Sequence, residues 1–392
     1  MNTKQLKLLA DIQTGPFGSQ LHKEDYVAVG TPIVTVEHLG NRVFTEQNLP
    51  MVSDSDKERL NKYVLKEGDI VFSRVGSVDR CSYVDAAHDG WMFSGRCLRV
   101  RPNKHLDAMY LYYYFCLEET KQFVRNIAVG ATMPSINTKL LGEVPIAFPS
   151  VEQQARVAQL LSTIDDKIEN NSKINDNLYE MVNAYYTSLF KDVECEMTTI
   201  GNYAERIYSG GTPTTSNAAY WDGAFGWFSS GETRNRFVIS TEKTITQAGI
   251  DNSSTKLAAK HDIVMASAGQ GFTRGQTSML LIDTYVNQSV IVIHAERKVL
   301  PYLFWNLANR YEELRAISDS SSIRGSLTTK MIAAFEIPLA NEESLQAFAD
   351  FSWSVIPQIE NNLLENERLA ALRDNLLPKL MSGEIDVSNI QL

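Results

Sequence analysis

Residues 164–178 read IDDKIENNSKINDNL, and residues 355–369 read VIPQIENNLLENERL. The two stretches share the letters IENN, which lie 191 positions apart. Within each stretch, apolar residues or asparagines recur at alternating steps of four and three, the spacing of a coiled-coil seam. The sequence therefore predicts two long helices with matched packing faces.

Each predicted seam contains two asparagines at equivalent places. The register residues are Ile164, Ile168, Asn171, Asn175 and Leu178 in the first helix, and Val355, Ile359, Asn362, Asn366 and Leu369 in the second. A buried amide fixes the register of a helix pair, because a slipped alignment leaves amides unpaired. The alternative is that the asparagines face solvent on ordinary amphipathic helices.

The two helices belong to a longer internal repeat. TGPFG (14–18) aligns with SGGTP (209–213), GDIVFSRVGS (68–77) with HDIVMASAGQ (261–270), and EVPIA (143–147) with EIPLA (336–340). The offset stays between 191 and 195 residues throughout. One module of mixed, strand-rich sequence followed by a helix is therefore written twice.

The predicted fold class is α+β, with two repeated β-rich modules joined and separated by two long helices. The expected boundaries are 1–150 and 195–340 for the modules, and 151–194 and 341–392 for the helical segments. Pseudo-two-fold symmetry predicts antiparallel helices that hold the modules at opposite ends, facing oppositely. Residues 164–189 would rise about 38 Å as a helix, close to one turn of B-DNA at about 34–36 Å.

Local patterns predict the elements inside each module. The candidate strands are 31–39, 69–75, 97–102, 262–268 and 290–295, separated by Gly, Asp and Asn turns. Helices are predicted at 106–123 and 301–315. The aromatic run Tyr110, Tyr112, Tyr113, Tyr114 and Phe115 favours core packing over a base-stacking platform.

Composition excludes several classes of protein. No stretch of the 392 residues approaches the roughly 20 apolar residues of a membrane span, and MNTKQLKLLADIQ resembles no secretion signal, so a cytoplasmic location is expected. Four scattered cysteines predict buried, reduced thiols. The net charge of −10 comes from the helical segments: 151–195 holds eight acidic and four basic residues, and 341–392 holds nine and three. The modules are electrically balanced.

Catalytic motifs are absent from the sequence. It contains no GxxxxGK[ST], HExxH or GxSxG, and no NPPY or FxGxG motif of the kind that binds S-adenosylmethionine and a target base. GQGFTRG (269–275) lacks dinucleotide-binding spacing, and the six histidines are isolated from one another. No cofactor, metal site or catalytic residue is predicted.

Several motifs together resemble the specificity subunit of type I restriction-modification systems. They are TGPFGSQL (14–21), YVLKEGDIVFSRVGS (63–77), VPIAFPSVEQQARVAQLLSTIDDKIENN (144–171) and LLPKLMSGEID (376–386). The resemblance extends over essentially the whole chain. The second copy, IPLANEESLQAFADFSWSVIPQIENN (337–362), departs from the pattern because it lacks EQQ and the aspartate pair.

The resemblance implies a non-catalytic DNA-recognition subunit that acts in phage defence. Each module would be a target-recognition domain that reads one half of a bipartite double-stranded DNA sequence. The helices would set the spacer and dock two methyltransferase subunits, which methylate adenine with S-adenosylmethionine. Restriction subunits that use ATP and Mg would join for cleavage.

Candidate DNA-binding residues lie in polar loops at repeat-equivalent places, because base edges and phosphates are bound by such side chains. In the first module they are Ser73, Arg74, Ser77, Arg80, Thr132, Ser135, Asn137 and Lys139. In the second they are Arg234, Arg236, Ser267, Gln270, Thr273, Arg274, Ser322, Arg324, Ser326, Thr328 and Lys330. TGPFG and SGGTP are expected to shape a backbone turn.

Two functions from other classes stay open at this point. A self-contained enzyme, such as a fused methyltransferase or nuclease, would require a cofactor or metal motif. A scaffold for protein partners would also suit duplicated modules on a coiled coil, but it would leave no footprint on DNA.

Overall fold

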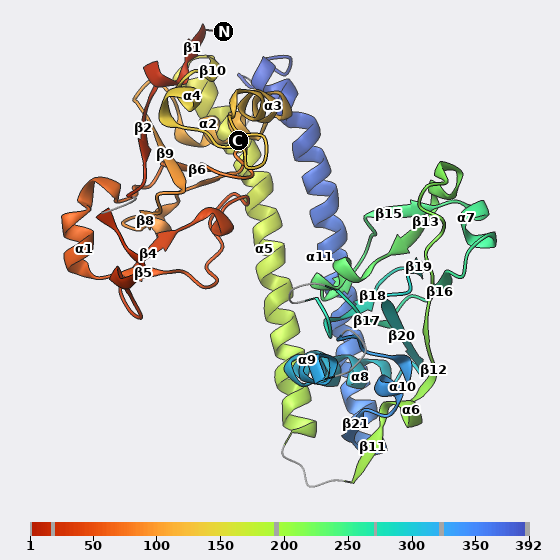
Figure 1. The fold of residues 1–392 in the computed structure, drawn as a ribbon. Helices are drawn as coiled ribbons and strands as arrows, with labels where there is room; N and C mark the ends of the chain where they lie inside the picture. The colour runs from red at the N-terminus through yellow and green to blue at the C-terminus, as the bar shows by residue number, and fades with distance from the viewer. Residues whose placement is uncertain (1, 17–19, 192–195, 270–272, 321–324, 389–392) are drawn as a thin grey trace. The chain divides into compact units, whose positions relative to one another are not determined.

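The computed structural model describes residues 2–16, 20–191, 196–269, 273–320 and 325–388. The chain divides into two compact units (Figure 1). Unit 1 is Met1–Lys167 with Leu369–Leu392, and unit 2 is Ile168–Arg368. The division passes through both long helices, so each unit contains a segment of each helix.

The described residues of unit 1 form three sheets. A four-stranded antiparallel sheet has the order β2 (Ala10–Thr14), β9 (Cys97–Pro102), β6 (Ile70–Ser73), β7 (Cys81–Tyr83). A smaller sheet has the order β3 (Tyr26–Val27), β5 (Met51–Val52), β4 (Thr31–Val34), β8 (Met92–Phe93). The third pairs β1 (Asn2–Gln5) with β10 (Pro145–Phe148).

Unit 2 repeats this plan. Its larger sheet has the order β12 (Ala204–Ser209), β20 (Val290–Ala295), β17 (Ile263–Ala266), β18 (Thr277–Leu280), β14 (Phe237–Val238). The next has the order β15 (Lys243–Ile245), β13 (Trp221–Phe228), β19 (Thr284–Val286), β16 (Lys256–Ala258). The third pairs β11 (Met197–Thr199) with β21 (Glu336–Pro338). The order β2-β9-β6-β7 thus recurs as β12-β20-β17-β18.

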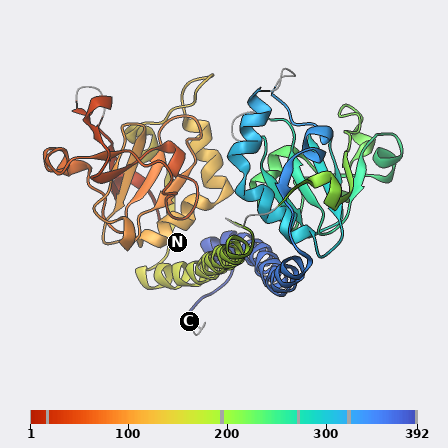
Figure 2. The same ribbon diagram turned by 90° about the horizontal axis from the view of Figure 1, so that it is seen from below.

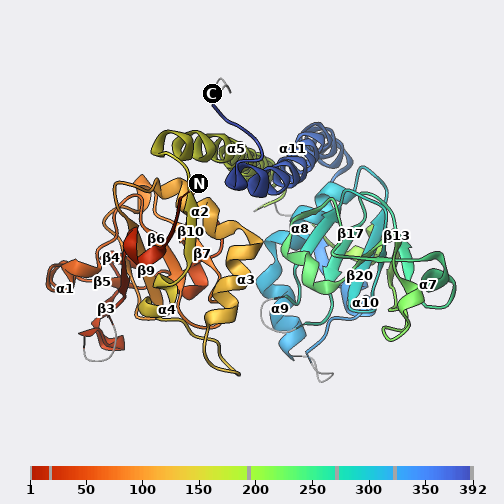
Figure 3. The same ribbon diagram turned by 90° about the horizontal axis from the view of Figure 1, so that it is seen from above.

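The helices recur as well. Unit 1 contains α1 (Asp54–Arg59), α2 (Ala108–Cys116), α3 (Glu118–Ile127) and α4 (Thr138–Gly142). Unit 2 contains α6 (Ile200–Tyr203), α7 (Gln247–Asp251), α8 (Leu300–Asn309), α9 (Tyr311–Ser320) and α10 (Thr329–Ala333). The long helices are α5 (Val151–Phe190) and α11 (Glu342–Ser382). α2 packs on the sheet that contains β6, β7 and β9 (Figure 3), as α8 packs on β18.

The central strands are buried on both faces, which explains their continuous apolar sequences. In β6, Ile70 and Phe72 belong to the core beneath α2, whereas Val71 belongs to the core of the smaller sheet. In β17, Ile263 and Val264 divide between two cores in the same way. The period-2 alternation of a strand produces this division.

The predicted helix pair is confirmed. α5 and α11 lie side by side (Figure 2). In unit 2, Asn171 Nδ2 donates to Asn366 Oδ1 at 2.9 Å, and Asn362 Nδ2 donates to Asn175 Oδ1 at 2.8 Å. The residue numbers rise along one helix as they fall along the other, so the helices are antiparallel. The asparagines pair as predicted, and the solvent-facing alternative is wrong.

The core predictions are confirmed for the aromatic run and for two thiols. Tyr110, Tyr113 and Phe115 are buried, and the Phe115 ring lies 4.6 Å from that of Phe72. Cys97 is buried, and this burial raises the pKa of its thiol to about 12. Cys81 is buried and Cys116 half-buried, both as free thiols, whereas Cys195 lies outside the described residues.

Two helix predictions were wrong in extent. The predicted helix 106–123 is two helices, because Leu117 leaves the helical conformation between α2 and α3 with ψ at 132°. The predicted helix 301–315 is divided at Arg310, between α8 and α9. The predicted strands 97–102 and 290–295 match β9 and β20, whereas 31–39 shortens to β4 and a 3-10 turn.

Candidate nucleic-acid interface

The predicted loops of unit 1 meet at one end of the larger sheet. β2 and β6 end there, and β7 and β9 begin there. We call the residues at this end loop cluster 1: 15–16, 74–80, 94–96 and 129–136. The Arg74 N–H donates to Arg96 O at 2.8 Å, and the Gly15 N–H donates to Cys97 O at 3.2 Å.

The loop of residues 129–136 is distant in sequence but joins the same cluster. The Ile136 N–H donates to Arg74 O at 2.9 Å, and the Gly76 N–H donates to Pro134 O at 2.9 Å. Val129 and Ser135 exchange backbone hydrogen bonds across the loop. The two groups of residues predicted in the first module are therefore brought together.

Unit 2 has an equivalent arrangement, which we call loop cluster 2: residues 210–213, 267–269, 273–276, 287–289 and 325–328. The Ser267 N–H donates to Ser289 O at 2.9 Å, as Arg74 does to Arg96. The Leu327 N–H donates to Ser267 O at 2.9 Å, as Ile136 does to Arg74. Both predicted groups of the second module meet here too. Gln270, Ser322 and Arg324 lie outside the described residues.

Gly15 of TGPFG and Gly210 of SGGTP lie where the backbone closely approaches a neighbouring segment, whereas Gly18 lies outside the described residues. A Cβ atom on Gly15 would collide with the backbone of Ser94, and one on Gly210 would collide with Val286 O. The backbone at each of these two positions therefore packs directly against the neighbouring segment, which requires a residue without a side chain.

Four of the predicted polar residues have roles inside the protein. Asn137 caps α4 by accepting from the Leu140 N–H at 2.9 Å, and Thr328 caps α10 by accepting from the Met331 N–H at 3.2 Å. Ser73 is buried and donates to Val75 O at 2.7 Å, and Ser267 is buried as well. Their positions stabilise the loops, because these caps satisfy backbone donors at the helix N-termini.

Three of the predicted arginines bind protein groups. Arg274 donates to Gly325 O at 2.5 Å and pairs with Asp319 at 2.7 Å. Arg234 pairs with Glu242 and donates to Gly231 O at 2.8 Å. Arg236 pairs with Asp176 of α5 at 3.3 Å and lies 4.2 Å from the ring centre of Tyr179. The Arg236 side chain therefore contacts α5.

The remaining predicted residues differ in exposure. Arg74 is half-buried and donates from Nη1 to Gly95 O at 3.2 Å, whereas Arg80 is exposed and donates to Leu39 O. Ser77, Thr132, Lys139 and Lys330 are exposed, and Ser135, Thr273 and Ser326 are half-buried. The exposed side chains are available to a large ligand at the surface.

The sequence reasoning missed two residues of the clusters, Arg96 and Ser289. Each precedes a predicted strand, and the two are 193 positions apart, an offset within the repeat. Aligning the turns before 97–102 and 290–295 would have found both. It also missed Gln154, which is buried, accepts from the Asp107 N–H at 2.8 Å and donates to Pro149 O at 3.0 Å.

Potential metal ligands are scattered in the described part of the chain. The described residues contain no group of three or more His, Cys, Asp and Glu that could hold a metal ion.

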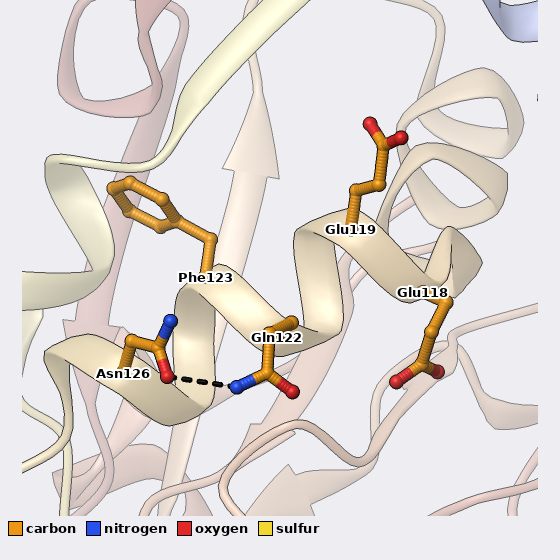
Figure 4. A pocket seen from close by; sticks show the side chains of 5 residues that line it. All are labelled: Glu118, Glu119, Gln122, Phe123 and Asn126. Carbon is orange, nitrogen blue, oxygen red and sulfur yellow. Dashed lines mark hydrogen bonds between the residues drawn. The ribbon is translucent and has the colours of Figure 1, made fainter.

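Five side chains of α3, including Glu118, Phe123 and Asn126, line an open pocket (Figure 4). Glu118 hydrogen-bonds Arg125, which raises the pKa of that guanidinium together with Asp79. No helix among the described residues is long and apolar enough to cross a membrane.

Known proteins resemble this chain over most of its length. The family model of the type I restriction modification DNA specificity domain matches residues 1–180 and 193–367. The HindI specificity subunit of Haemophilus influenzae is 21% identical, over 83% of this chain and 88% of that protein. The MjaIX specificity subunit of Methanocaldococcus jannaschii is 20% identical, over 99% of this chain and 94% of that protein.

The fold resembles that of a solved structure. A crystal structure of the type I restriction-modification S subunit from M. genitalium superposes with a TM-score of 0.60 at 18% identity, over 97% of this chain and 95% of that one. The family model covers both copies of the internal repeat. The chain therefore belongs to the family of type I restriction-modification DNA specificity subunits.

Proposed function

We propose that this chain reads a bipartite DNA sequence, with one target-recognition domain (1–150 and 195–340) for each half-site. The observation that carries the proposal is the repetition of the loop clusters. Equivalent loops meet at equivalent ends of equivalent sheets, and the same backbone hydrogen bonds join them. Two copies of one surface suit a ligand that presents two comparable sites.

The side chains of the clusters suit DNA in kind. Arginine, serine, threonine and lysine read base edges in the major groove and bind phosphates. The net charge of −10 is no obstacle, because the acidic excess lies in the helical segments. Modules of balanced charge with a few exposed cations can approach the phosphate backbone without net repulsion.

The helix pair would set the spacing of the half-sites. α5 and α11 are continuous helices of 40 and 41 residues, and both pass from one unit into the other. A rigid pair with a polar register has a nearly fixed length. That the modules face oppositely stays a prediction.

The helices would also dock two methyltransferase subunits, which would contribute S-adenosylmethionine chemistry, while restriction subunits would contribute ATP and Mg. Ile174 and Met181 of α5 are 42% and 44% exposed and seven residues apart, hence on one helix face. Exposed apolar residues beside acidic ones suit a protein partner. This chain would then supply recognition without catalysis.

Coexpression with its cognate methyltransferase in a host without other adenine methylation, followed by methylome sequencing, tests the proposal. We expect one bipartite motif with an unread spacer. Methyl transfer by the purified chain alone would identify an enzyme instead. A complex that leaves no footprint on any DNA would identify a scaffold.

Removing one heptad from both helices at paired positions tests whether the helix pair sets the spacing of the half-sites. The pair should shorten by about 10 Å, and the spacer by about three base pairs. Asn177→Ala, an exposed change on α5 that keeps its length, is the control. An unchanged spacer after the double deletion would show that the helices do not set it.

A further inference from the structure

The two loop clusters differ in chemistry at one pair of equivalent positions. In loop cluster 1 the backbones of Arg74 and Arg96 are joined by a hydrogen bond of 2.8 Å. In loop cluster 2 the same bond, at 2.9 Å, joins Ser267 and Ser289. Two guanidinium groups in one module therefore correspond to two hydroxyl groups in the other.

The Arg96 side chain is available for a ligand. It is exposed, and within the described part of the chain its guanidinium forms no hydrogen bond or ion pair. Asp79 is the one acidic residue within loop cluster 1, and Arg125 of α3 pairs with it at 2.5 Å. This pairing leaves no free carboxylate within loop cluster 1 to compete with DNA for Arg96.

Arg74 contacts the turn that contains Arg96. Its Nη1 donates to Gly95 O at 3.2 Å, so the guanidinium lies against the turn that presents Arg96. Arg74 thereby supports the turn, and its guanidinium places a second positive charge close to it. Both charges contribute to the potential that an approaching phosphate experiences.

Among its described residues, loop cluster 2 has no exposed cation at this place. Its described cation is Arg274, which is 18% exposed and bound by Asp319 and Gly325. The Ser289 N–H donates to Asn287 Oδ1 at 2.9 Å, which fixes the turn in a form that presents hydroxyl and amide groups. Such groups bind DNA without releasing counterions.

We propose that Arg96, supported by Arg74, is a DNA contact of the first module that has no counterpart in the second. The inference rests on the proposed function. The first half-site is then bound through charge as well as hydrogen bonds. At the equivalent place of the second module Ser289 offers a neutral hydroxyl group, so this position adds to salt-dependent affinity only in the first module.

Binding of the methyltransferase complex to its methylome-derived target, measured by fluorescence anisotropy at several salt concentrations, tests this inference. Arg96→Ser should weaken binding about tenfold at physiological salt and reduce the slope of log affinity against log salt by about 1. Ser289→Arg should increase that slope by about 1. Arg96→Lys should retain it, because the charge remains.

Lys104→Ser is the matched control. Lys104 is exposed just beyond the other end of β9, so its loss removes the same charge away from the cluster. We expect wild-type affinity and slope for this variant. Thermal unfolding of each complex shows whether any variant has lost its fold.

The outcomes separate the two proposals. A wild-type complex that binds no specific DNA contradicts the proposed function itself. If the wild type binds specific DNA but Arg96→Ser and Lys104→Ser have equal effects, the proposal for Arg96 is overturned and the proposed function is not. A slope that falls equally in Arg96→Lys and Arg96→Ser also overturns the proposal for Arg96, because charge would then not be the cause.

Discussion

Asn171 of α5 donates its amide hydrogens to Asn366 of α11 at 2.9 Å and to Glu365 at 2.7 Å. Asn171 is only 1% exposed, so its amide depends on these partners. Water cannot replace them without opening the helix pair. The contact therefore favours one register of the two helices over slipped alternatives.

Replacing Asn366 with leucine should destabilise unit 2 by about 1–3 kcal/mol, because the buried Asn171 amide loses an acceptor. Urea unfolding followed by tryptophan fluorescence measures this, since Trp305 stacks on Tyr179 of α5 at 5.6 Å. The exposed Asn170→Leu is the control and should change stability little. Equal effects of the two variants would contradict a register role.

Arg373→Val should destabilise unit 1 by about 3 kcal/mol, because it leaves the Asp165 carboxylate buried without its ion pair. Arg373 pairs with Asp165 at 2.6 Å, and the Asp165 side chain is 8% exposed. Urea unfolding measures the loss, and the exposed Arg368→Val is the control.

The double variant Asp165→Ile with Arg373→Val should recover most of that stability. The repeat-equivalent residues Ile356 and Val182 already occupy the apolar core of unit 2. Recovery should be incomplete, because the Tyr113 hydroxyl, which donates to Asp165 at 2.6 Å, loses its acceptor. A double variant as unstable as Arg373→Val would show that the apolar pair of the second copy cannot replace the ion pair of the first.

Gln154→Leu should destabilise unit 1 by about 1–3 kcal/mol, although leucine occupies the equivalent position 345 in the second copy. The substitution removes the acceptor of the Asp107 N–H and the donor to Pro149 O, both inside the protein. Thermal unfolding against the exposed Gln159→Leu measures the difference. If Gln154→Leu instead lost methyltransferase binding at full stability, the glutamine would serve a partner.

The stability of unit 2 should fall as the pH drops below about 6.5, the ordinary pKa of histidine. Burial, then Arg297 and Lys260, lower the pKa of His261. The unfolded chain thus binds a proton at a higher pH than the folded one. The stabilisation is complete above the ordinary pKa, and it is lost as the pH falls toward the lowered folded pKa.

His261→Asn should remove this pH dependence, and thermal midpoints at pH 8 and pH 5 measure it. Asparagine suits the site because His261 has φ at 79°, in the left-handed region that asparagine tolerates, and the first copy has Gly68 there with φ at 87°. The exposed His105→Asn in unit 1 is the control. A variant that keeps the wild-type pH dependence would assign it to another group.

The EQQ motif acquires a structural explanation from Gln154. The second copy of the repeat lacks this motif. The Gln154 side chain is buried and bonds only within unit 1. Leu345, at the equivalent place, is buried in the core of unit 2. The difference between the copies is therefore at least partly internal packing.

The sequence alone determined the duplication, the two long helices and their asparagine pairing. Heptad spacing is a local pattern, and the repeat is found by comparing the sequence with itself. Both can therefore be recognised without coordinates. The central strand 290–295 was equally clear, because burial on both faces favours an unbroken apolar run such as VIVI at 290–293.

Only the tertiary structure decided where the helices break and which loops meet. Neither Leu117 nor Arg310 is a glycine or proline, so the local sequence contains no stop signal at either break. At the second break Arg310 donates to Glu336 O at 2.6 Å, a partner distant in sequence. The meeting of Arg74 with residues 134–136 likewise depends on hydrogen bonds between segments far apart in the chain, which local pattern cannot specify.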